Sequence, residues 1–533
     1  MRNSKRTDGR FALTGLIAGG ILTVAGPRAL AQLTDMTQTP NPARSGIAKS
    51  FEEQIGAGRG DVMTPDSSIF LIERDPFRSI RRGRQLFQRK FTLAQGNGPR
   101  TGDGIGDIAM DPSIGAGLAD SCASCHGRPR GAAGFGGDVY TRPDSRDAPH
   151  LFGLGLIEML GDEITQDLRR IRRQVVEEAR AEERTITLPL ISKGIDFGFI
   201  TSDAKGSLDT SRVVGVDPDL RVRPFFHEGK TISIREFVVG ALNAEMGLEA
   251  PDPDLAAAAA GTNIVTPSGM RLTGSEDRIE APPAQHETDD PDGDGVTNEI
   301  PVAIVDHFEF YLLNYFKPAT HRQSRTVRSG QELFAAIGCT QCHIPDLKIN
   351  HDRRVADVET RYSPDEPGFN RLFAVAEPRF LAQDDGSGLP MLKRPEGKPF
   401  VVRNLYADFK RHDLGPNFHE RHFDGTVTTM FMTEPLWGVG STPPYGHDGR
   451  SVNLSDVILR HGGEAQQARD AFAQLSAARR ALILDFLNSL VLFPPDDTAS
   501  NLNPGDPSTP GFPQFGHGSI KLPALFNDPT DPE

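Results

Sequence analysis

Two short stretches of the form C-x-x-C-H contain all four cysteines of the 533-residue chain. In this motif the two thiols add to the vinyl groups of a haem, and the histidine becomes an axial ligand of the iron. A redox C-x-x-C pair, a zinc half-site or a disulfide would not explain a histidine directly after both pairs. The sequence therefore predicts two covalently bound haem c groups. The residues concerned are Cys122, Cys125 and His126 in the first set, and Cys339, Cys342 and His343 in the second.

Each motif is followed by one copy of a second repeat. Residues 224–241 read PFFHEGKTISIREFVVGA, and residues 444–461 read PYGHDGRSVNLSDVILRH. His227 aligns with His447, and an H-x-G phrase is followed in both copies by a helix with apolar spacing. The chain therefore contains a diverged internal duplication, not a short-period solenoid.

The two copies of this repeat differ at their last residue. Fourteen residues after its histidine, the second copy ends in His461, where the first copy ends in Ala241. A haem with histidine on both faces is closed and suits electron transfer, whereas a haem with one free face can bind peroxide or oxygen. We therefore expect His343 and His461 to close the C-terminal haem, and we expect the haem on His126 to be open or weakly capped. A surface histidine is the alternative for His461.

The elements that must position these residues are mainly helices. The phrase G-x-x-L-F, which starts at Gly83 and again at Gly330, predicts a helix before each motif. Residues 162–183 have the apolar stripe of another helix, and β-prone runs at 185–222 predict a small hairpin. Residues 467–493 predict one long amphipathic helix. Small cytochromes pack such a terminal helix on the G-x-x-L-F helix, so we expect the same packing in this chain.

The predicted fold class is mainly α, with two cytochrome c-like haem domains, long irregular loops and a small β insert. The 41 prolines and 55 glycines favour much irregular chain. The predicted division is 1–31 signal peptide, 32–75 polar N-terminal arm, 76–285 N-terminal haem domain with the β insert, 286–320 linker with a calcium loop, 321–493 C-terminal cytochrome c-like haem domain, and 494–533 Pro/Gly-rich tail.

The first 31 residues have the pattern of a cleaved secretory signal peptide. Basic residues precede a short apolar run, and Ala29-Leu30-Ala31 forms an A-x-A cleavage site. This pattern predicts a periplasmic or secreted protein. We find no other apolar run of about 18 residues, so no membrane span is expected. The net charge of −14 argues against nucleic acid as a partner.

Residues 290–299 read DPDGDGVTNE, which matches the start of a calcium loop. Position twelve of such a loop is normally a bidentate glutamate, but here it is Pro301. Glu299 is placed to supply the missing oxygens in a shorter loop, and an acidic turn without metal is the alternative. The aspartates at alternate positions are Asp290, Asp292 and Asp294.

Together these motifs resemble the di-haem cytochrome c peroxidase and MauG superfamily, and most closely its "di-haem oxidoreductase, putative peroxidase" branch. The resemblance extends from about Gly83 to Phe493. It is carried by SCASCHG, RPFFHEGKTISIREFVVGALNAEMG, LFAAIGCTQCHIPDL and EPLWGVGSTPPYGHDGRSVNLSDVILRHGGEA. It implies that the N-terminal haem reacts with peroxide, that the C-terminal haem relays an electron, and that His461 is the second ligand of the C-terminal haem.

The resemblance also implies two site residues near the first haem. Glu245 matches the acid that helps to split the O–O bond, because a carboxyl over an open haem can move a proton between the peroxide oxygens. A solvated helix-end carboxylate is the alternative. His227 stands where the peroxidases have the tryptophan between the haems, while the chain's only tryptophan is Trp437. The usual distal histidine loop is missing, and only Tyr140 could ligate from that stretch. His150 is expected to pack near a haem propionate.

These features favour an exported di-haem c-type oxidoreductase that reacts with hydrogen peroxide at the N-terminal haem. His126 would be the proximal ligand there, Glu245 the acid–base group, and the C-terminal haem the electron relay. A haem-dependent oxygenase that uses O₂ on an apolar substrate is one alternative. A non-catalytic di-haem electron-transfer cytochrome is the other. The expected partner is a small electron-donor protein or an exported substrate.

Overall fold

The computed structural model describes most of the chain between residues 50 and 491. The described ranges are 50–98, 119–127, 146–315, 324–362, 397–421 and 425–491, with short pieces at 133–134, 136, 138–139, 372–378, 381–382, 386 and 392–393. The expected signal peptide, the expected tail and Tyr140 lie outside these residues. The described chain is helical with small antiparallel sheets, as the sequence predicts.

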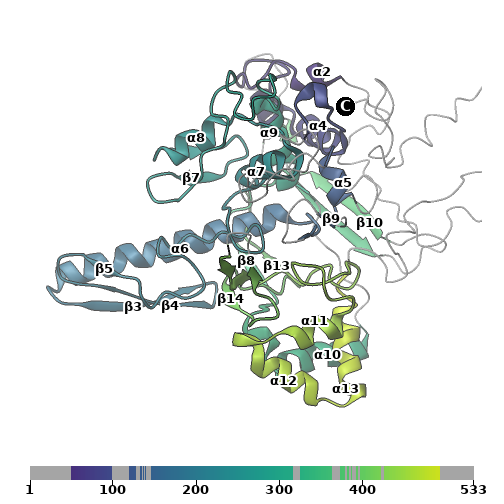
Figure 1. Ribbon diagram of the computed structural model, residues 1–533. Helices are drawn as coiled ribbons and strands as arrows, with labels where there is room; N and C mark the ends of the chain where they lie inside the picture. The colour runs from purple at the N-terminus through teal and green to yellow at the C-terminus, as the bar shows by residue number, and fades with distance from the viewer. Residues whose placement is uncertain are drawn as a thin grey trace, which may run out of the picture.

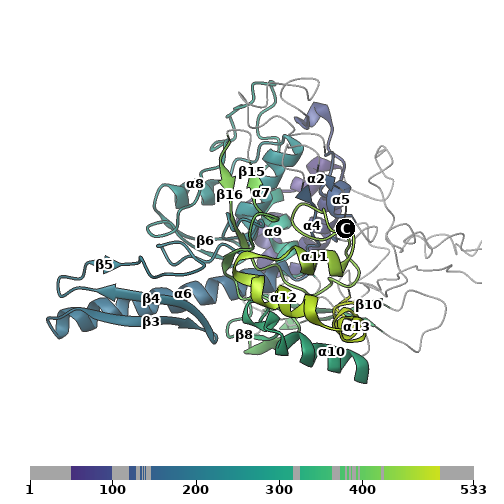
Figure 2. The same cartoon turned by 60° about the horizontal axis from the view of Figure 1, so that its bottom comes forward.

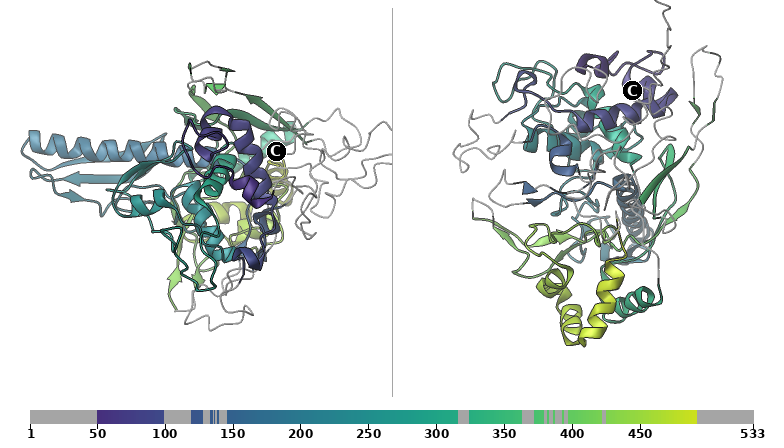
Figure 3. Two further views of the ribbon diagram at one scale, coloured as in Figure 1. Left: turned by 90° about the horizontal axis from the view of Figure 1, so that it is seen from above. Right: turned by 90° about the vertical axis from the view of Figure 1, so that its right-hand side faces the viewer.

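The helices form two groups (Figures 1 and 3). In the first, α4 (Pro76–Gln88) packs on α9 (Val302–Leu313). A Cβ atom at Gly83 would lie 2.3 Å from the carbonyl oxygen of His307, so glycine permits this close approach. The short helix α5 (Cys122–His126) carries the first C-x-x-C-H motif beside α4.

Helix α9 lies inside the range 286–320, which the sequence predicts to be a linker. Eleven of its twelve residues are buried, from Ala303 to Leu313. A helix that is apolar on all sides belongs in a core, and α9 packs in the same hydrophobic cluster as α4 and α7 (Ile234–Met246). This part of the expected linker is therefore a central helix of the first group.

Helix α7 is held against α9 by a buried ion-pair cluster around Arg235. The Arg235 side chain is fully buried, and burial of so polar a group requires carboxylate partners. Its guanidinium nitrogens lie 2.7 Å from Asp252, 2.8 Å from Asp306 and 3.0 Å from Glu309.

The second group contains α10 (Arg325–Ala336), α11 (Leu454–Arg460), α12 (Gln466–Gln474) and α13 (Ala477–Leu487). A Cβ atom at Gly330 would lie 1.9 Å from the carbonyl oxygen of Leu482, so α10 and α13 repeat the close contact of α4 and α9. The single long helix expected at 467–493 is wrong. Leu475 is extended, and the Ser476 side chain caps a new helix by accepting from the Arg479 backbone N–H at 3.4 Å.

An elongated arm projects from the side of the molecule (Figure 1). It consists of α6 (Leu154–Ala181), about 42 Å long at 1.5 Å per residue, and the antiparallel strands β3 (Ile186–Ser192), β4 (Ile195–Ser202) and β5 (Leu208–Asp209). The predicted hairpin is present with one added strand. The helix begins eight residues earlier than the expected start at 162.

The expected polar arm at 32–75 is wrong in its described part. Helices α2 (Phe51–Ile55) and α3 (Ser68–Arg74) lie there, and Phe70, Leu71 and Ile72 are buried. The Ser68 hydroxyl also donates to Asp306 of α9 at 2.6 Å. This segment therefore belongs to the first helical group.

Short antiparallel strand pairs lie between and around the two helical groups (Figure 2). The pair β14 (Arg411–Asp413) and β17 (Met430–Met432) contributes to the site below. The other pairs are β1 (Asp138–Val139) with β2 (Arg146–Asp147), β6 (Asn263–Val265) with β7 (Arg271–Thr273), β8 (Leu347–Ile349) with β13 (Phe400–Val402), β9 (Ala356–Tyr362) with β10 (Leu372–Pro378), β11 (Leu381–Ala382) with β12 (Leu392–Lys393), and β15 (Glu420–Arg421) with β16 (Val427–Thr428). One more helix, α8 (Pro253–Ala259), follows α7, and 3₁₀ turns lie at Leu93–Gln95, Cys339–Gln341 and Gly463–Ala465.

Within the described ranges, no helix has both the length and the apolar character needed to cross a membrane.

Candidate functional site

The two copies of the downstream repeat adopt the same local structure. Each begins with a turn closed by one antiparallel bridge, Phe225 with Thr231 in the first copy and Tyr445 with Ser451 in the second. A polar side chain then caps the following helix. Ser233 accepts from a backbone N–H of α7 at 3.1 Å, and Asn453 accepts from α11 at 3.0 Å. The duplication read from the sequence is therefore also a structural one.

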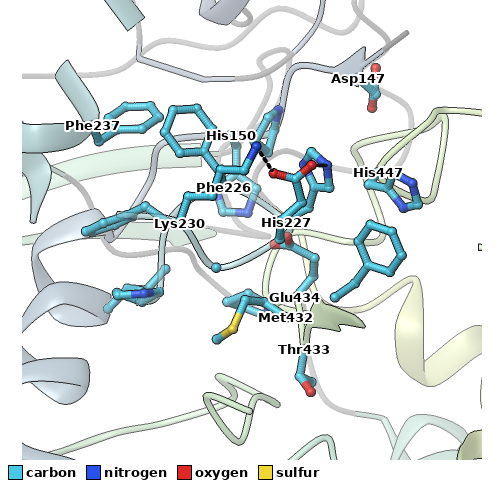
Figure 4. A pocket seen from close by; sticks show the side chains of 18 of the residues that line it. Asp147, His150, Phe226, His227, Lys230, Phe237, Met432, Thr433, Glu434 and His447 are labelled. Carbon is cyan, nitrogen blue, oxygen red and sulfur yellow. Dashed lines mark ion pairs between the residues drawn. The ribbon is translucent and has the colours of Figure 1, made fainter. Parts of the chain in front are cut away.

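One large cavity joins the two C-x-x-C-H motifs. Its volume is about 1290 Å³, above the roughly 300–1,000 Å³ of an ordinary small-molecule pocket. All six motif residues line it, together with side chains of α7, α11 and β17. Figure 4 shows part of the cavity wall. The cavity is therefore large enough to hold more than one large bound ligand.

Three histidines on this cavity have the same hydrogen-bonding pattern. In each, Nδ1 bonds to a backbone carbonyl: His126 to Pro149 at 2.8 Å, His343 to Tyr406 at 2.9 Å, and His461 to Val457 at 2.7 Å. This bond fixes the ring and leaves Nε2 available, which is the arrangement of metal-binding histidines.

The protonation of these histidines also suits iron ligation. Desolvation by the surrounding protein lowers the pKa of His126 and His461, and it lowers the pKa of His343 to about 4. The neighbouring His461 contributes to the shift of His343, so these two rings lie within electrostatic reach of each other. All three rings therefore stay neutral at pH 7, in the form that binds a metal.

The four cysteines are free thiols and form no disulfide. Burial raises the pKa of Cys122 and of Cys339 to about 12, so neither is a reactive thiolate. Their positions next to His126 and His343, on the cavity wall, fit thioether attachment of a haem to each motif. The donor set of the cavity thus fits two haem groups.

The last residues of the two repeat copies both line the cavity. His461 is the C-cap of α11, and its charge acts on His343, which places it near the second motif. Ala241 lies on α7. Glu245, one turn further along α7, also lines the cavity, half-buried. Its charge acts on the Cys125 thiol, which places the carboxyl near the first motif.

His227 lies in an aromatic stack between the two repeats. The His227 and His447 rings are stacked, with centroids 4.9 Å apart and planes 9° apart. Phe431 of β17 stacks on His447 at 4.4 Å. Backbone hydrogen bonds also hold each histidine turn from outside the repeats. The Met432 N–H donates to the His227 carbonyl at 2.7 Å, and the Asp147 N–H donates to the His447 carbonyl at 3.2 Å. The pair aligned in the sequence is therefore in contact in space (Figure 4).

Acidic side chains approach the His227 end of the stack. The His227 Nε2 atom lies 3.5 Å from a carboxylate oxygen of Glu420 and 3.8 Å from one of Glu228. Lys230 pairs in turn with Glu228 at 2.5 Å. Two carboxylates therefore lie close to the imidazole of His227.

Two further cavity residues were missed by sequence reasoning. Glu434 follows β17 and faces the cavity, where desolvation by the surrounding protein raises its pKa to about 7. His412 of β14 bonds to Asp408 at 2.9 Å and to Glu464 at 2.8 Å beside the second motif. Glu434 is the first residue of the EPLWGVG phrase, and His412 lies in a strand of three residues, but nothing in the sequence singles out either side chain as a cavity residue. Only the tertiary structure places them there.

His150 is anchored through Nε2, unlike the three histidines above. Its Nε2 atom bonds to the carbonyl of Trp437 at 3.0 Å, and Trp437 itself is buried. Burial lowers the pKa of His150 to about 4. The ring lies on the cavity wall, near His126.

The acidic residues of the expected calcium loop lie together. Oxygens of Asp290, Asp292 and Asp294 are within 4.8 Å of one another, and so are oxygens of Asp292, Glu299 and Glu249. Burial, and then the charges of the nearby carboxylates, raises the pKa of Glu299 to about 8. Sequence reasoning missed Glu249, which is some 40 residues from the loop in the chain.

The cavity with its two C-x-x-C-H motifs and ligand-ready histidines defines a candidate haem site, and comparison with known proteins supports this class. Residues 373–490 match the family described as "Di-haem oxidoreductase, putative peroxidase". The resemblance expected from the sequence is thereby confirmed over this range, which includes His461. The match supports a di-haem oxidoreductase, and the family implies haem as the cofactor.

Two other comparisons add little. Among solved structures, the chain is similar to hydrazine synthase of Kuenenia stuttgartiensis, in a structure pressurised with 20 bar xenon. The identity is 12%, the coverage is 85% of this chain and 100% of the other, and the TM-score is 0.34, which is too low to support an argument. No curated protein matches the chain.

Proposed function

We propose that this chain is an exported di-haem c-type oxidoreductase that reduces hydrogen peroxide at its N-terminal haem and receives electrons through its C-terminal haem. The observation that carries the proposal is the unequal distribution of the cavity histidines whose Nδ1 atom bonds to a backbone carbonyl. The second unit contributes two, His343 and His461, whereas the first contributes His126 and has Ala241 at the matching position. Export is inferred because haem is attached to C-x-x-C-H motifs outside the cytoplasm.

The first unit would hold its haem through three residues. Cys122 and Cys125 would form the thioethers of the first haem, and His126 would ligate its iron from one side. When bound there, haem supplies an iron whose free face can accept a peroxide oxygen. The Ala241 side chain is a single methyl group, so α7 would leave that face open.

Glu245 would supply the proton transfer at this open face. Its carboxylate lies on the cavity wall near Cys125, so it is positioned to accept a proton from one peroxide oxygen and to return it to the other. Val238 and Leu242, on the same helix, are buried and also line the cavity, so this part of its wall is largely apolar.

The stack of His227, His447 and Phe431 would couple the two units. His227 stands at the position where the resemblance places a tryptophan, and the three rings line the same cavity as the two motifs. Stacked aromatic rings provide a short path for an electron. The carboxylates of Glu228 and Glu420 would hold the imidazole proton while the charge passes.

The test is the electron paramagnetic resonance spectrum of the resting holoprotein. The proposal expects one low-spin haem with two histidine ligands and one high-spin haem with one. Two low-spin bis-histidine signals would overturn it and would favour a non-catalytic electron-transfer cytochrome.

A turnover assay separates the two enzymatic hypotheses. With a reduced small cytochrome as donor, the proposal expects peroxide-dependent oxidation of that donor. Consumption of O₂ with an apolar substrate, without peroxide turnover, would identify an oxygenase instead.

A further inference from the structure

Five carboxylates from two distant segments converge beside the first helical group. Asp290, Asp292 and Asp294 come from one loop, and their oxygens lie within 4.8 Å of one another. Asp292 also belongs to a second cluster of the same size with Glu249 and Glu299. Because a Ca²⁺–O bond is about 2.3–2.6 Å long, two oxygens on one ion can lie at most about twice that distance apart. The spacing therefore suits a shared cation.

The inner side of this cluster is buried, which distinguishes it from an ordinary acidic turn. Glu299 is only 3% exposed, and Glu249 only 1%. One oxygen of Glu299 accepts from the Glu249 backbone N–H at 2.6 Å. Its other oxygen, Oε1, is buried and has no hydrogen-bond partner in the described part of the chain. A buried carboxylate oxygen without a partner is costly unless it binds a cation.

The local packing holds the Glu299 side chain in place. A Cβ atom at Gly96 would lie 2.1 Å from the Glu299 carboxyl group, so this group rests directly on the Gly96 backbone. Gly96 has φ of +89°, a conformation that glycine adopts readily. The missing side chain at Gly96 therefore leaves room for the carboxyl, and one oxygen of Glu299 lies within 4.8 Å of oxygens of Glu249 and Asp292.

The chemistry of the donors selects the class of metal. All the candidate ligands are carboxylates, and neither cysteine nor histidine takes part. Oxygen-only sites with several negative charges favour hard cations, and a large irregular ligand set favours Ca²⁺ over Mg²⁺. The buried pair of Glu249 and Glu299 would replace the bidentate glutamate that an EF-hand loop has where Pro301 stands here.

We propose that five carboxylates bind one calcium ion at this position: Glu249, Asp290, Asp292, Asp294 and Glu299.

The position of this site gives the ion a structural role. Glu249 follows the end of α7, whose last turn carries Glu245, and Glu299 precedes α9. The two segments already touch, because the Ile300 N–H donates to the Glu249 carbonyl at 3.1 Å. The ion would hold the end of α7 against the start of α9. The existence of the site is independent of the proposed function, whereas its effect on Glu245 rests on it.

Calorimetric titration of the chelator-treated holoprotein with CaCl₂ tests the site directly. We expect one Ca²⁺ to bind per chain. In Glu299→Gln and in Glu249→Gln, the affinity for Ca²⁺ should fall by a factor of about ten or more. Asp292→Asn provides a third variant should a buried substitution prevent folding. Asp289→Asn is the matched control, because Asp289 is a half-buried carboxylate beside the loop that belongs to neither cluster and accepts from the backbone N–H groups of Gln285 and His286.

The outcomes of the titration separate this site from the peroxidase proposal. Absence of Ca²⁺ binding in the wild type, equal binding of MgCl₂, or unchanged affinity in a folded Glu249→Gln variant would overturn the five-carboxylate calcium site. Because the titration measures binding and not turnover, a protein that binds Ca²⁺ without peroxidase activity would overturn only the proposed function. Loss of Ca²⁺ should also lower the unfolding temperature of the wild type but not of Asp292→Asn.

Discussion

The two helical groups contain the same parts but use them differently. Both have a glycine contact between two helices, a C-x-x-C-H motif, and a bridged turn followed by a capped helix. At matching positions of that last helix, one group has Ala241, inside α7, and the other has His461, the C-cap of α11. Helix α7 continues beyond Ala241 to Met246, whereas α11 ends at Arg460. The comparison teaches that the two copies of a duplicated scaffold differ here both in the side chain and in the length of the helix that carries it.

The largest effect is expected from making the first group resemble the second. Ala241→His would place an imidazole at the position of His461 and close the first haem. If about 1% of the protein remained open, peroxide turnover would fall about 100-fold. Electron paramagnetic resonance should show loss of the high-spin signal. Ala260→His, at the exposed end of α8, is the control and should leave both the spectrum and turnover unchanged.

The converse change makes the second helical group resemble the first by removing His461. His461→Ala should convert the second haem from six-coordinate to five-coordinate, and imidazole added to the buffer should restore the original spectrum. Loss of an axial ligand should also shift the one-electron potential of the second haem, and a shift of about 59 mV would change the equilibrium constant for its reduction about tenfold in a redox titration. An unchanged optical spectrum in this variant would remove His461 from the ligand set.

The glycine contacts test how far the two groups are structurally equivalent. Gly83→Ala and Gly330→Ala each force a methyl group against a backbone carbonyl, of His307 and Leu482 respectively. Each should lower the free energy of unfolding by about 1–3 kcal/mol in denaturant titrations of the holoprotein. Ser329→Ala, next to Gly330, should change it by no more than about 0.5 kcal/mol. If only one glycine variant lost stability, the equivalence of the two contacts would be refuted.

The smallest effect is expected at the contact between the repeats. His227→Leu removes an aromatic ring from the stack, whereas His227→Phe keeps one. Stacked aromatic pairs contribute about 0.5–1.5 kcal/mol, so both variants should fold. In a single turnover with stoichiometric peroxide, oxidation of the second haem should slow severalfold in the leucine variant and less in the phenylalanine variant. Equal rates in the two variants would argue against a relay through this stack.

The sequence predicts the parts of the site that local chemistry specifies. Haem attachment requires cysteines at a set spacing, so the motifs at Cys122 and Cys339 are recognisable without a structure. The alignment of the repeats likewise brings His227 to His447 and singles out His461. These residues share one cavity in the structure, and the family match covers the segment that contains His461.

The sequence does not reveal contacts that arise only from long-range packing. Phe431 reaches the stack from a three-residue strand, and Glu249 reaches the acidic loop from the end of a helix. The position of α9 was missed for a different reason. A helix buried on all sides has no amphipathic stripe to indicate which neighbours it contacts. The break at Ser476 was visible, since serine is a common N-cap, but the apolar spacing continued across it.

The order of the parts along the chain also has a consequence for biosynthesis. In each group the helix that packs against the G-x-x-L-F glycine comes after the cysteine motif: α9 follows Cys122, and α13 follows Cys339. A chain that is made and exported from its N-terminus presents its thiols before the covering helix has emerged. Contacts between segments so far apart also form late in folding. Under the proposed function, this order would keep each attachment point accessible during the interval in which a covalent bond to the haem is made.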